Sequence, residues 1–426
     1  MNESEAALPL SRMARGLVGS EILKIAAEIR AMVARGETVY NLTVGDFRSD
    51  LFPIPDALKR ATIEALEAGE TNYPPSDGMP ELRKAVEEFY AARLGLDPAG
   101  TRVVVSGGVR PAIYAAYSTL LSPGDGLLYP VPSWNNNHYA WLAGANPIEV
   151  VARPASHFLP TAEDLAPHVA RAAVLLLNSP LNPAGTAYGE REMEQIVRLV
   201  LDENAARARR GARPLIVLYD QVYWMLTFGD VRHVTPVGID PRMRDFTVFV
   251  DGISKAFAAT GLRVGWCVGP AAIMEPMSAL LGHIGAWAPR AEQVATARFL
   301  RDGAAVDAYQ RTFKRGIEAR LAALHEGFGR LRADGFPVES IAPQSAIYLS
   351  ARFGLIGKNA GGRRLATNED VRRFLLEKAA LAVVPFQAFG LREETGWFRL
   401  SVGALPAEHL EALFPALRRA LGEVED

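Results

Sequence analysis

The chain of 426 residues has only one cysteine, Cys267. A single cysteine excludes an intramolecular disulfide and any zinc site that needs several thiolates, and it is typical of a reducing compartment. The seven histidines do not show the spacing of a metal site. Because Cys267 lies in the apolar run Val264–Val268, we expect a thiol packed in the core and not a nucleophile.

The chain also lacks a strong excess of charge and a long apolar stretch. Its formal net charge is -2, with 22% charged and 49% hydrophobic residues, so neither nucleic acid nor an anionic membrane is an expected partner. No apolar run reaches the length that a membrane-spanning helix needs. The first residues, Met1–Glu5, are polar and acidic, unlike a signal peptide. Together these features predict a cytoplasmic location.

Seven short apolar runs alternate with helical patterns through the middle of the chain. Their near-continuous valine, isoleucine and leucine content is typical of strands buried on both faces, and the intervening helices imply parallel connections. The runs are 102–105, 126–129, 147–151, 173–177, 214–218, 247–250 and 264–268. The pattern predicts an α/β fold whose large domain contains a mostly parallel seven-stranded sheet.

The remaining sequence predicts a smaller second domain. A helical pattern extends from about 289 to 332, and short strands then mix with helices at 368–378 and 407–421. Near the other end, a predicted helix at about 20–35 and a predicted strand at 39–44 precede a proline-rich link. The chain is longer than a usual single core. We therefore expect three parts: an N-terminal segment, 1–49, that joins the small domain, a large domain, 50–300, and an α+β small domain, 301–426.

One lysine, Lys255, closely follows the predicted buried strand 247–250. An ammonium at the end of such a strand is costly unless it is paired or used, and a desolvated lysine can form a Schiff base with a carbonyl. Arg263, slightly further along the chain, would be a permanently charged phosphate binder. An aldehyde-binding lysine and a phosphate-binding arginine suggest a single cofactor, pyridoxal 5'-phosphate.

Polar clusters directly follow four of the predicted strands. Because ligands of open α/β sheets bind outside the carboxyl ends of the strands, the four clusters would line one crevice. They are 106–110, 178–185, 219–223 and 251–255. A Ser-Lys pair after a strand is by itself more often a surface turn, so the interpretation depends on the four clusters together.

The chemistry of the cofactor suggests roles for residues of the crevice. The segment Gly108, Val109 and Arg110 opens a helix, where backbone amides can approach a phosphate closely. Asp220 is a predicted buried carboxylate that would pair with the protonated pyridine nitrogen and make the ring an electron sink.

Other side chains would contact the ring or the substrate. Asn182 and Tyr223 can donate to the phenolate oxygen of the cofactor. Trp134 offers a face on which the ring can stack, although it could also be an ordinary core residue. Lys255 would first hold the cofactor and then act as the general base that moves the α-proton of the substrate.

As a set, these motifs resemble those of the class I/II aminotransferases, which belong to the fold type I pyridoxal-phosphate enzymes. The matching segments extend from near residue 20 to near residue 403 in the family's order, and together they are highly specific. They are Asn72-Tyr73 with Gly78 and Leu82-Arg83, 178–185, Tyr219-Asp220 with Tyr223, Ser254-Lys255 with Thr260-Gly261 and Arg263, and 398–401.

The resemblance implies further site residues. Arg399 would bind the α-carboxylate of the substrate, with Gly45 and Asn182 beside it. Tyr73 would reach the phosphate of the neighbouring subunit's cofactor, which implies a homodimer with shared active sites. In place of this assignment, Arg399 could simply pair with a carboxylate such as Glu393 or Glu394.

Around the lysine, the resemblance adds one contact and leaves another open. Ser254 would join Lys255 in holding the cofactor. The family usually has serine or threonine at the position of Gly252, where the hydroxyl contacts the phosphate, so that contact is open here.

The resemblance implies an aminotransferase that moves an amino group between an amino acid and a 2-oxo acid. The alternative is a carbon–sulfur lyase that uses the same cofactor on a sulfur amino acid, because both reactions begin with removal of the same α-proton. A non-enzymatic, cofactor-free protein of this fold is disfavoured, because every principal cofactor position except Gly252 is filled.

Overall fold

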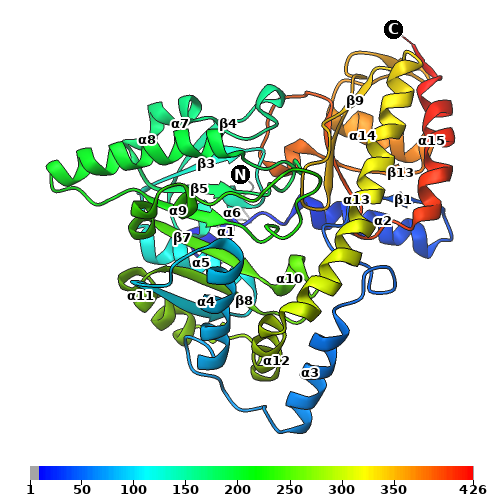
Figure 1. The fold of residues 1–426 in the computed structure, drawn as a ribbon. Helices are drawn as coiled ribbons and strands as arrows, with labels where there is room; N and C mark the ends of the chain where they lie inside the picture. Colours follow the sequence, from blue (N-terminus) through cyan, green and yellow to red (C-terminus); the bar gives the residue numbers. More distant parts are fainter. Residues whose placement is uncertain (1–8, 426) are drawn as a thin grey trace.

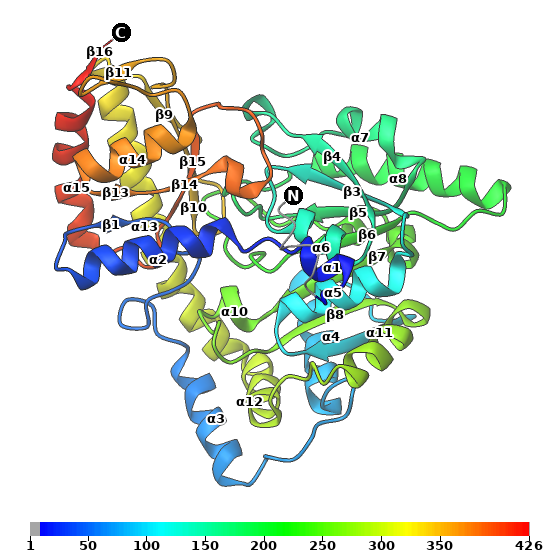
Figure 2. The same ribbon diagram turned by 180° about the vertical axis from the view of Figure 1, so that it is seen from behind.

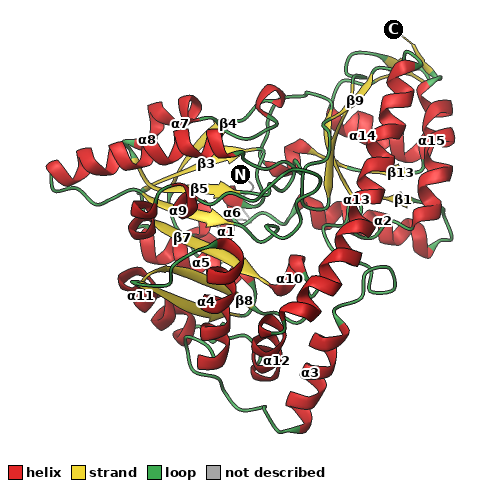
Figure 3. Cartoon of the chain, in the orientation of Figure 1, coloured by secondary structure: helices red, strands yellow, loops and turns green. Residues whose placement is uncertain are grey.

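The computed structural model describes residues 9–425 of the chain. The polar stretch Met1–Glu5 and the first eight residues of the predicted N-terminal segment lie outside this range. A seven-stranded sheet forms the centre of the larger part, with its strands between helices (Figure 3). Its strands are β2 (Thr101–Ser106), β3 (Gly126–Val131), β4 (Asn146–Val151), β5 (Ala172–Asn178), β6 (Ile216–Asp220), β7 (Thr247–Gly252) and β8 (Gly265–Pro270).

The order of the strands across the sheet is β2-β8-β7-β6-β5-β3-β4. The pairs from β4 to β7 are parallel, whereas β8 is antiparallel to both of its neighbours, β2 and β7. Strand β2 therefore points the same way as β5, β6 and β7. The carboxyl ends of these four strands lie at one edge of the sheet, and the prediction of a mostly parallel seven-stranded sheet is confirmed.

Helices cover both faces of this sheet, which explains the continuous apolar runs. Alternate residues of β5 belong to different clusters of the core, because successive side chains of a strand point to opposite faces. Leu175 and Leu177 belong to the cluster that contains Ile196 of α8, and Val174 belongs to the cluster that contains Ile113 of α5. Figure 1 shows α8 on the near side of the sheet, and Figure 2 shows α5 on the opposite side.

The helices have the following bounds. The α-helices are α1 (Arg12–Arg15), α2 (Glu21–Ala34), α3 (Asp56–Glu67), α4 (Pro80–Leu94), α5 (Val109–Leu120), α6 (Asn136–Leu142), α7 (Ala162–Val169), α8 (Glu190–Arg209), α9 (Pro236–Ile239), α10 (Ile253–Ala256), α11 (Ala271–His283), α12 (Arg290–Arg301), α13 (Gly303–Ala333), α14 (Asn368–Ala379) and α15 (Ala407–Leu421). Short 3-10 helices lie at Pro154–Ser156, Pro241–Phe246 and Phe386–Phe389.

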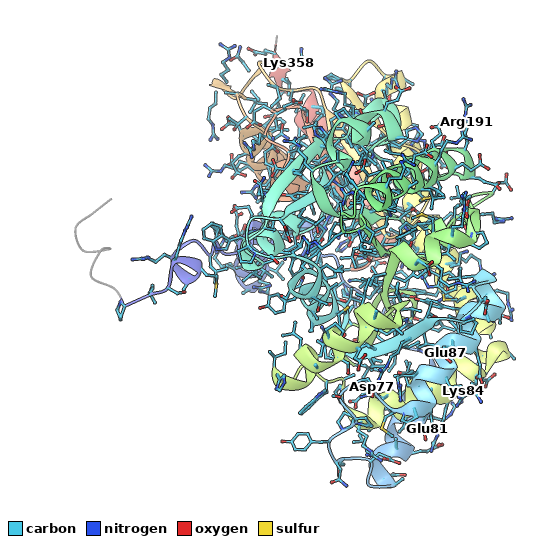
Figure 4. The ribbon with its side chains drawn as sticks, turned by 90° about the vertical axis from the view of Figure 1, so that its left-hand side faces the viewer. Asp77, Glu81, Lys84, Glu87, Arg191 and Lys358 are labelled. Carbon is cyan, nitrogen blue, oxygen red and sulfur yellow. The ribbon has the colours of Figure 1, made fainter. Side chains whose placement is uncertain are left out.

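Helix α4 illustrates how the covering helices are built. It buries Leu82, Val86 and Phe89, which recur at the spacing of one helix face, and it begins with a proline whose missing N–H has no partner to lose there. Glu81 and Lys84 point outward at the surface of the molecule (Figure 4). Among the helices of residues 9–425, none is long and apolar enough to cross a membrane.

The C-terminal part of the chain forms a second assembly around an antiparallel sheet of order β14-β15-β10-β9. Helices α13, α14 and α15 lie around it (Figure 1). The strands of this part, with the strand that joins it from the N-terminus, are β1 (Tyr40–Asn41), β9 (Val338–Ser340), β10 (Tyr348–Phe353), β11 (Asn359–Ala360), β12 (Arg363–Arg364), β13 (Leu381–Ala382), β14 (Val384–Pro385), β15 (Trp397–Ser401) and β16 (Val424–Glu425).

The beginning of the chain packs on this C-terminal part. Strand β1 pairs in parallel with β13, and Glu28 of α2 forms an ion pair with Arg372 of α14 at 3.0 Å. Figures 1 and 2 show α2, in blue, alongside the C-terminal elements. The division into 1–49, 50–300 and 301–426 stays a prediction.

Two predicted elements differ from the observed ones. The helical pattern at 289–332 forms two helices, α12 and α13, because the backbone leaves helical geometry at Asp302, whose side chain accepts a hydrogen bond from Ala305 N–H and caps α13. The predicted strand 39–44 is only Tyr40–Asn41. The Asn41 side chain accepts from both the N–H and the hydroxyl of Thr43, at 3.1 and 2.7 Å, and this local turn ends the strand.

Candidate active site

Lys255 lies in α10, one short turn after the end of β7. Its Nζ donates a hydrogen bond to the carbonyl oxygen of Gly45 at 2.6 Å, and it lies 5.8 Å from the ring centre of Phe47 and 6.0 Å from that of Tyr223. Burial lowers the pKa of Lys255 to about 8, and the Asp46 carboxylate acts in the opposite direction. A fraction of the amine is therefore neutral near pH 7, as a nucleophile or a general base requires.

Asp220 lies at the carboxyl end of β6, the strand next to β7. Burial raises its pKa to about 6, and its Oδ1 accepts a hydrogen bond from Val222 N–H at 3.1 Å. Within residues 9–425, none of the arginine or lysine side chains forms an ion pair with it. A half-buried carboxyl without a cationic partner can receive a protonated ring nitrogen.

Arg263 and Gly108 are in close contact beside the first turn of α5. Arg263 donates from Nη1 to Thr260 O at 2.8 Å and from Nη2 to Gly107 O at 3.1 Å. Gly108 has a φ of 93°, and a Cβ there would lie 2.2 Å from the guanidinium of Arg263. Gly108 also caps α5 without a side-chain hydrogen bond, so the first amides of the helix are available to an anion.

Close packing explains the glycine at position 252. A Cβ on Gly252 would lie 2.7 Å from Val264 O and 2.8 Å from Gly265 Cα. A Cβ on Gly265 would in turn lie 2.6 Å from the carbonyl carbon of Gly108. The three glycines allow the last residue of β7, the first residue of β8 and the start of α5 to pack closely together. A serine side chain at position 252 would push these three elements apart. Ser254 is buried beside Lys255.

Arg399 is a buried side chain of β15, in the C-terminal part of the chain. It donates from Nη1 to Asn182 Oδ1 at 3.1 Å and from Nη2 to Thr43 O at 2.7 Å, while its buried Nε has no partner. Its guanidinium carbon lies 4.6 Å from the ring centre of Tyr348 and 4.8 Å from that of Phe389. The two aromatic rings therefore fix the position of the guanidinium, whose Nε donor is not used.

The alternative that Arg399 pairs with a nearby glutamate is wrong. The carboxylate of Glu394 accepts from Asn368 N–H and from the Gln387 amide. The hydrogen bonds of Arg399 go instead to Asn182 and to the backbone of Thr43.

Asn182 and Tyr223 lie between Arg399 and the end of the large sheet. The amide oxygen of Asn182 accepts from Arg399, which leaves its NH₂ group free to donate elsewhere. The hydroxyl of Tyr223 lies 2.6 Å from that of Tyr348. Gly45 packs against Tyr348 and Arg399, since a Cβ there would lie 3.0 Å from the Tyr348 hydroxyl and 3.6 Å from Arg399 Nη1.

Trp134 and Arg110 contact each other. Trp134 is half-buried, and the guanidinium carbon of Arg110 lies 4.6 Å from its ring centre. Arg110 is exposed, and no carboxylate of residues 9–425 pairs with it. Tyr73 is separate: it is 83% exposed and packs edge-on against Trp287 at 5.2 Å between ring centres. Within residues 9–425, Tyr73 and Arg110 are the predicted site residues whose side chains are exposed.

The structure adds three residues that the sequence did not identify: Asp46, Thr260 as a side chain, and Tyr348. Asp46 follows Gly45 directly, so a polar pair after a predicted strand was an available signal. Tyr348 lies within a short apolar strand and carries no such signal. Cys267 is buried in β8, in agreement with the predicted core thiol, and burial raises its pKa.

Comparison with known proteins identifies the family. Residues 37–417 match the family model described as aminotransferase class I and II. The chain belongs to the class I and II aminotransferases. The match covers the N-terminal segment that carries Gly45, the large sheet that carries Lys255 and the C-terminal strand that carries Arg399.

Individual relatives of this aminotransferase agree with the family assignment. The chain is 31% identical over 414 residues to a probable aspartate/prephenate aminotransferase of Rhizobium leguminosarum bv. phaseoli, covering 95% of this chain and 96% of that protein. It is 31% identical over 433 residues to an aspartate aminotransferase of Streptomyces avermitilis, covering 99% and 100%.

Solved structures of the same family have the same fold. The crystal structure of the aspartate aminotransferase of Rhizobium meliloti superposes with a TM-score of 0.88 at 27% identity, covering 98% of this chain and 100% of that one. An aromatic aminotransferase of Pyrococcus horikoshii gives a TM-score of 0.79 at 28% identity, covering 94% and 99%. These relatives support an aminotransferase that moves an amino group between an amino acid and a 2-oxo acid, and not the carbon–sulfur lyase alternative.

Proposed function

We propose that this aminotransferase holds pyridoxal 5'-phosphate on Lys255. The observation that carries the proposal is the convergence, at one edge of the large sheet, of a lysine with a lowered pKa, a half-buried carboxyl at Asp220 without a cationic partner and the Arg263–Gly108 cradle. When bound, the cofactor withdraws electrons from the α-carbon of the substrate and carries the amino group between the two substrates.

The phosphate would lie between Arg263 and the first turn of α5. The fit is supported by the absence of a side chain at Gly108, where even a Cβ would meet Arg263. Backbone amides of Gly108, Val109 and Arg110 would donate to the phosphate, together with the guanidinium of Arg263 and the hydroxyl of Ser254. Gly252 supplies no hydroxyl, and its packing against Gly265 gives a structural reason for that absence.

The ring of the cofactor would extend from the phosphate toward Asp220. The raised pKa of this carboxyl, about 6, reflects burial without a cation, and a protonated ring nitrogen would supply the missing partner. The free NH₂ group of Asn182 and the hydroxyl of Tyr223 would donate to the phenolate oxygen, and the half-buried face of Trp134 would stack on the ring.

The substrate would be held by its α-carboxylate. Arg399 has one buried, unpaired donor and a guanidinium held between two aromatic rings, so it is arranged to receive a planar anion. Gly45 and Asn182 lie on the same side. Lys255 would take the α-proton: with a pKa of about 8, about a tenth of the amine is neutral at pH 7.

Tyr73 supports the further proposal of a homodimer with shared active sites. This aromatic side chain is 83% exposed beside Trp287, whose carbonyl oxygen lies close to Gly107 of the phosphate cradle. Tyrosine and tryptophan are among the residues that are enriched in protein–protein interfaces. We also propose a cytoplasmic location, in keeping with the single cysteine.

The experiment is a transfer assay on the purified protein. A panel of amino acids is incubated with 2-oxoglutarate or pyruvate, with aspartate and an aromatic amino acid as the first donors because relatives bear those names. We expect the acceptor to become a new amino acid, in an amount equal to the 2-oxo acid that forms from the donor. Release of pyruvate and ammonia from a cysteine conjugate, without any new amino acid, would contradict the proposal.

A further inference from the structure

A short turn from the N-terminal segment, Gly45–Phe47, covers the amine of Lys255. Its contacts reach both parts of the molecule. On the large-sheet side, Asp46 Oδ1 accepts from the Thr260 hydroxyl at 2.7 Å, and Gly45 O accepts from Lys255 Nζ at 2.6 Å. On the C-terminal side, a Cβ on Gly403 would lie 2.2 Å from Asp46 O, so the turn rests directly on the backbone there.

The carboxylate of Asp46 is held in one orientation. Its Oδ1 accepts from its neighbour Phe47 N–H at 2.8 Å as well as from Thr260, and Asp46 itself is half-buried. Two donors on one oxygen fix the side chain without neutralising it, because neither donor is a cation. Within residues 9–425, Asp46 forms no ion pair with arginine or lysine.

The charged groups that act on Lys255 are mostly positive. Arg399 of β15, Arg110 of α5 and Arg263 before β8 all disfavour its ammonium, whereas Asp46 favours it. The phenol of Tyr223 faces the amine at 6.0 Å, and Asp220 ends the strand beside β7. Among the charged side chains of residues 9–425 that act most on the amine, Asp46 is the anion, and its charge also acts on the Tyr348 hydroxyl beside Arg399.

We propose that Asp46 is a positioning residue for Lys255: its fixed carboxylate holds a proton on the amine and keeps the Gly45 carbonyl against it. Burial, and to a smaller extent the three arginines, would otherwise favour loss of the proton. The carboxylate thus balances the amine between the protonated form, which binds Gly45, and the neutral form, which can react. The inference rests on the proposed role of Lys255, but the property that it concerns is the protonation of the side chain itself.

The test measures the titration of Lys255 in the full-length protein stripped of cofactor. Acetic anhydride labels amines in proportion to their neutral fraction, and mass spectrometry of the peptide that contains Lys255 gives the titration midpoint across a pH series. We expect Asp46→Asn to lower the midpoint by about one unit, which raises the neutral fraction at pH 7 roughly fivefold, from about a tenth to about a half.

Two further variants separate the charge of Asp46 from other effects. Asp50→Asn removes an exposed acid shortly after Asp46 in the chain, which pairs with Arg48, and should leave the midpoint unchanged. Thr260→Val keeps every charge and removes only the hydroxyl that donates to Asp46, so it should lower the midpoint by less than Asp46→Asn does. Thr260→Val also provides the test if the Asp46→Asn protein does not fold. A midpoint unchanged or raised in Asp46→Asn, or unchanged in Thr260→Val when that is the folded variant, would overturn the proposal. Cofactor attachment is read separately from visible absorbance, so its failure would not alter this titration.

Discussion

Two arginines of the candidate active site are built into the fold in different ways. Arg263 donates to backbone carbonyls of Thr260 and Gly107 and lies against Gly108. The two glycines directly follow β2, and Thr260 lies in the loop before β8. Arg399 donates to Asn182 and Thr43, and it lies between the rings of Tyr348 and Phe389. The surroundings of Arg399 come from segments as far apart as residues 43 and 399.

The difference indicates that the two arginines bind different anions. The Arg263 region is a backbone cradle with space kept open by glycines, which suits a phosphate that stays bound. The Arg399 region is a rigid cation between aromatic side chains from several segments, which suits a carboxylate that enters and leaves. If this account is right, changes in the two regions should affect cofactor and substrate separately.

The largest expected effect follows from Arg399→Ala. Removing a buried donor that would make charge-assisted hydrogen bonds to the α-carboxylate should lower kcat/KM for the amino donor about 100-fold or more, with little change in cofactor affinity. Steady-state kinetics measure kcat/KM, and a cofactor titration measures the cofactor affinity. The kcat/KM of Arg399→Lys, which keeps the positive charge but loses the planar guanidinium, should lie between those of the wild type and Arg399→Ala. An unchanged KM would mean that Arg399 is structural.

The converse change is Arg263→Ala. Loss of the phosphate-binding guanidinium should raise the dissociation constant of the cofactor about 10- to 100-fold, while KM for the donor at saturating cofactor stays near that of the wild type. Equilibrium titration followed by absorbance measures the affinity. Loss of donor binding with full cofactor affinity would reverse the assignment of the two regions.

A matched pair of glycine substitutions sharpens the description of the cradle. Gly108→Ala and Gly69→Ala both place a Cβ at a positive φ, 93° and 79°, so each should lose about 1 kcal/mol of unfolding free energy from backbone strain. Only Gly108→Ala also meets Arg263, whereas nothing lies within 4 Å of a Cβ at Gly69. We expect weaker cofactor binding in the first variant alone; equal cofactor affinity in both would argue against the cradle.

A last prediction concerns Lys255, on whose amine both arginines act. Its pKa is about 8 in the folded protein, below its ordinary 10.5, so a stability penalty is fully present below pH 8 and is relieved as pH rises toward about 10.5. The cofactor-free Lys255→Met protein should therefore be more stable than the cofactor-free wild type at pH 7, and the difference should shrink above pH 8. Urea unfolding across this pH range measures it; a difference that grows with pH would contradict the lowered pKa.

The same comparison explains how much could be predicted from the sequence. The seven strands were predictable because burial on both faces leaves continuous apolar runs, and the four polar clusters after them reveal one edge of the sheet. The Arg263 cradle belongs to this local pattern. The surroundings of Arg399 do not, because Tyr348 and Phe389 are apolar residues of ordinary appearance that only the tertiary fold brings to the guanidinium.

The smaller differences between the prediction from sequence and the structure have similar causes. The break between α12 and α13 depends on one capping side chain, Asp302, inside a helical pattern that is otherwise continuous. Asp46 stood next to a predicted site residue, but its partner Thr260 lies over 200 residues away in the chain. Gly252 looked like a missing phosphate contact until its packing against Gly265 supplied a reason for the glycine.

The most direct test of the central claim is to identify the residue that carries the cofactor. The purified protein, saturated with pyridoxal 5'-phosphate, is reduced with sodium borohydride, digested and analysed by mass spectrometry. We predict a phosphopyridoxyl group on Lys255, and its absence in Lys255→Met. Stoichiometric modification of a different lysine, or none at all, would contradict the account of this site.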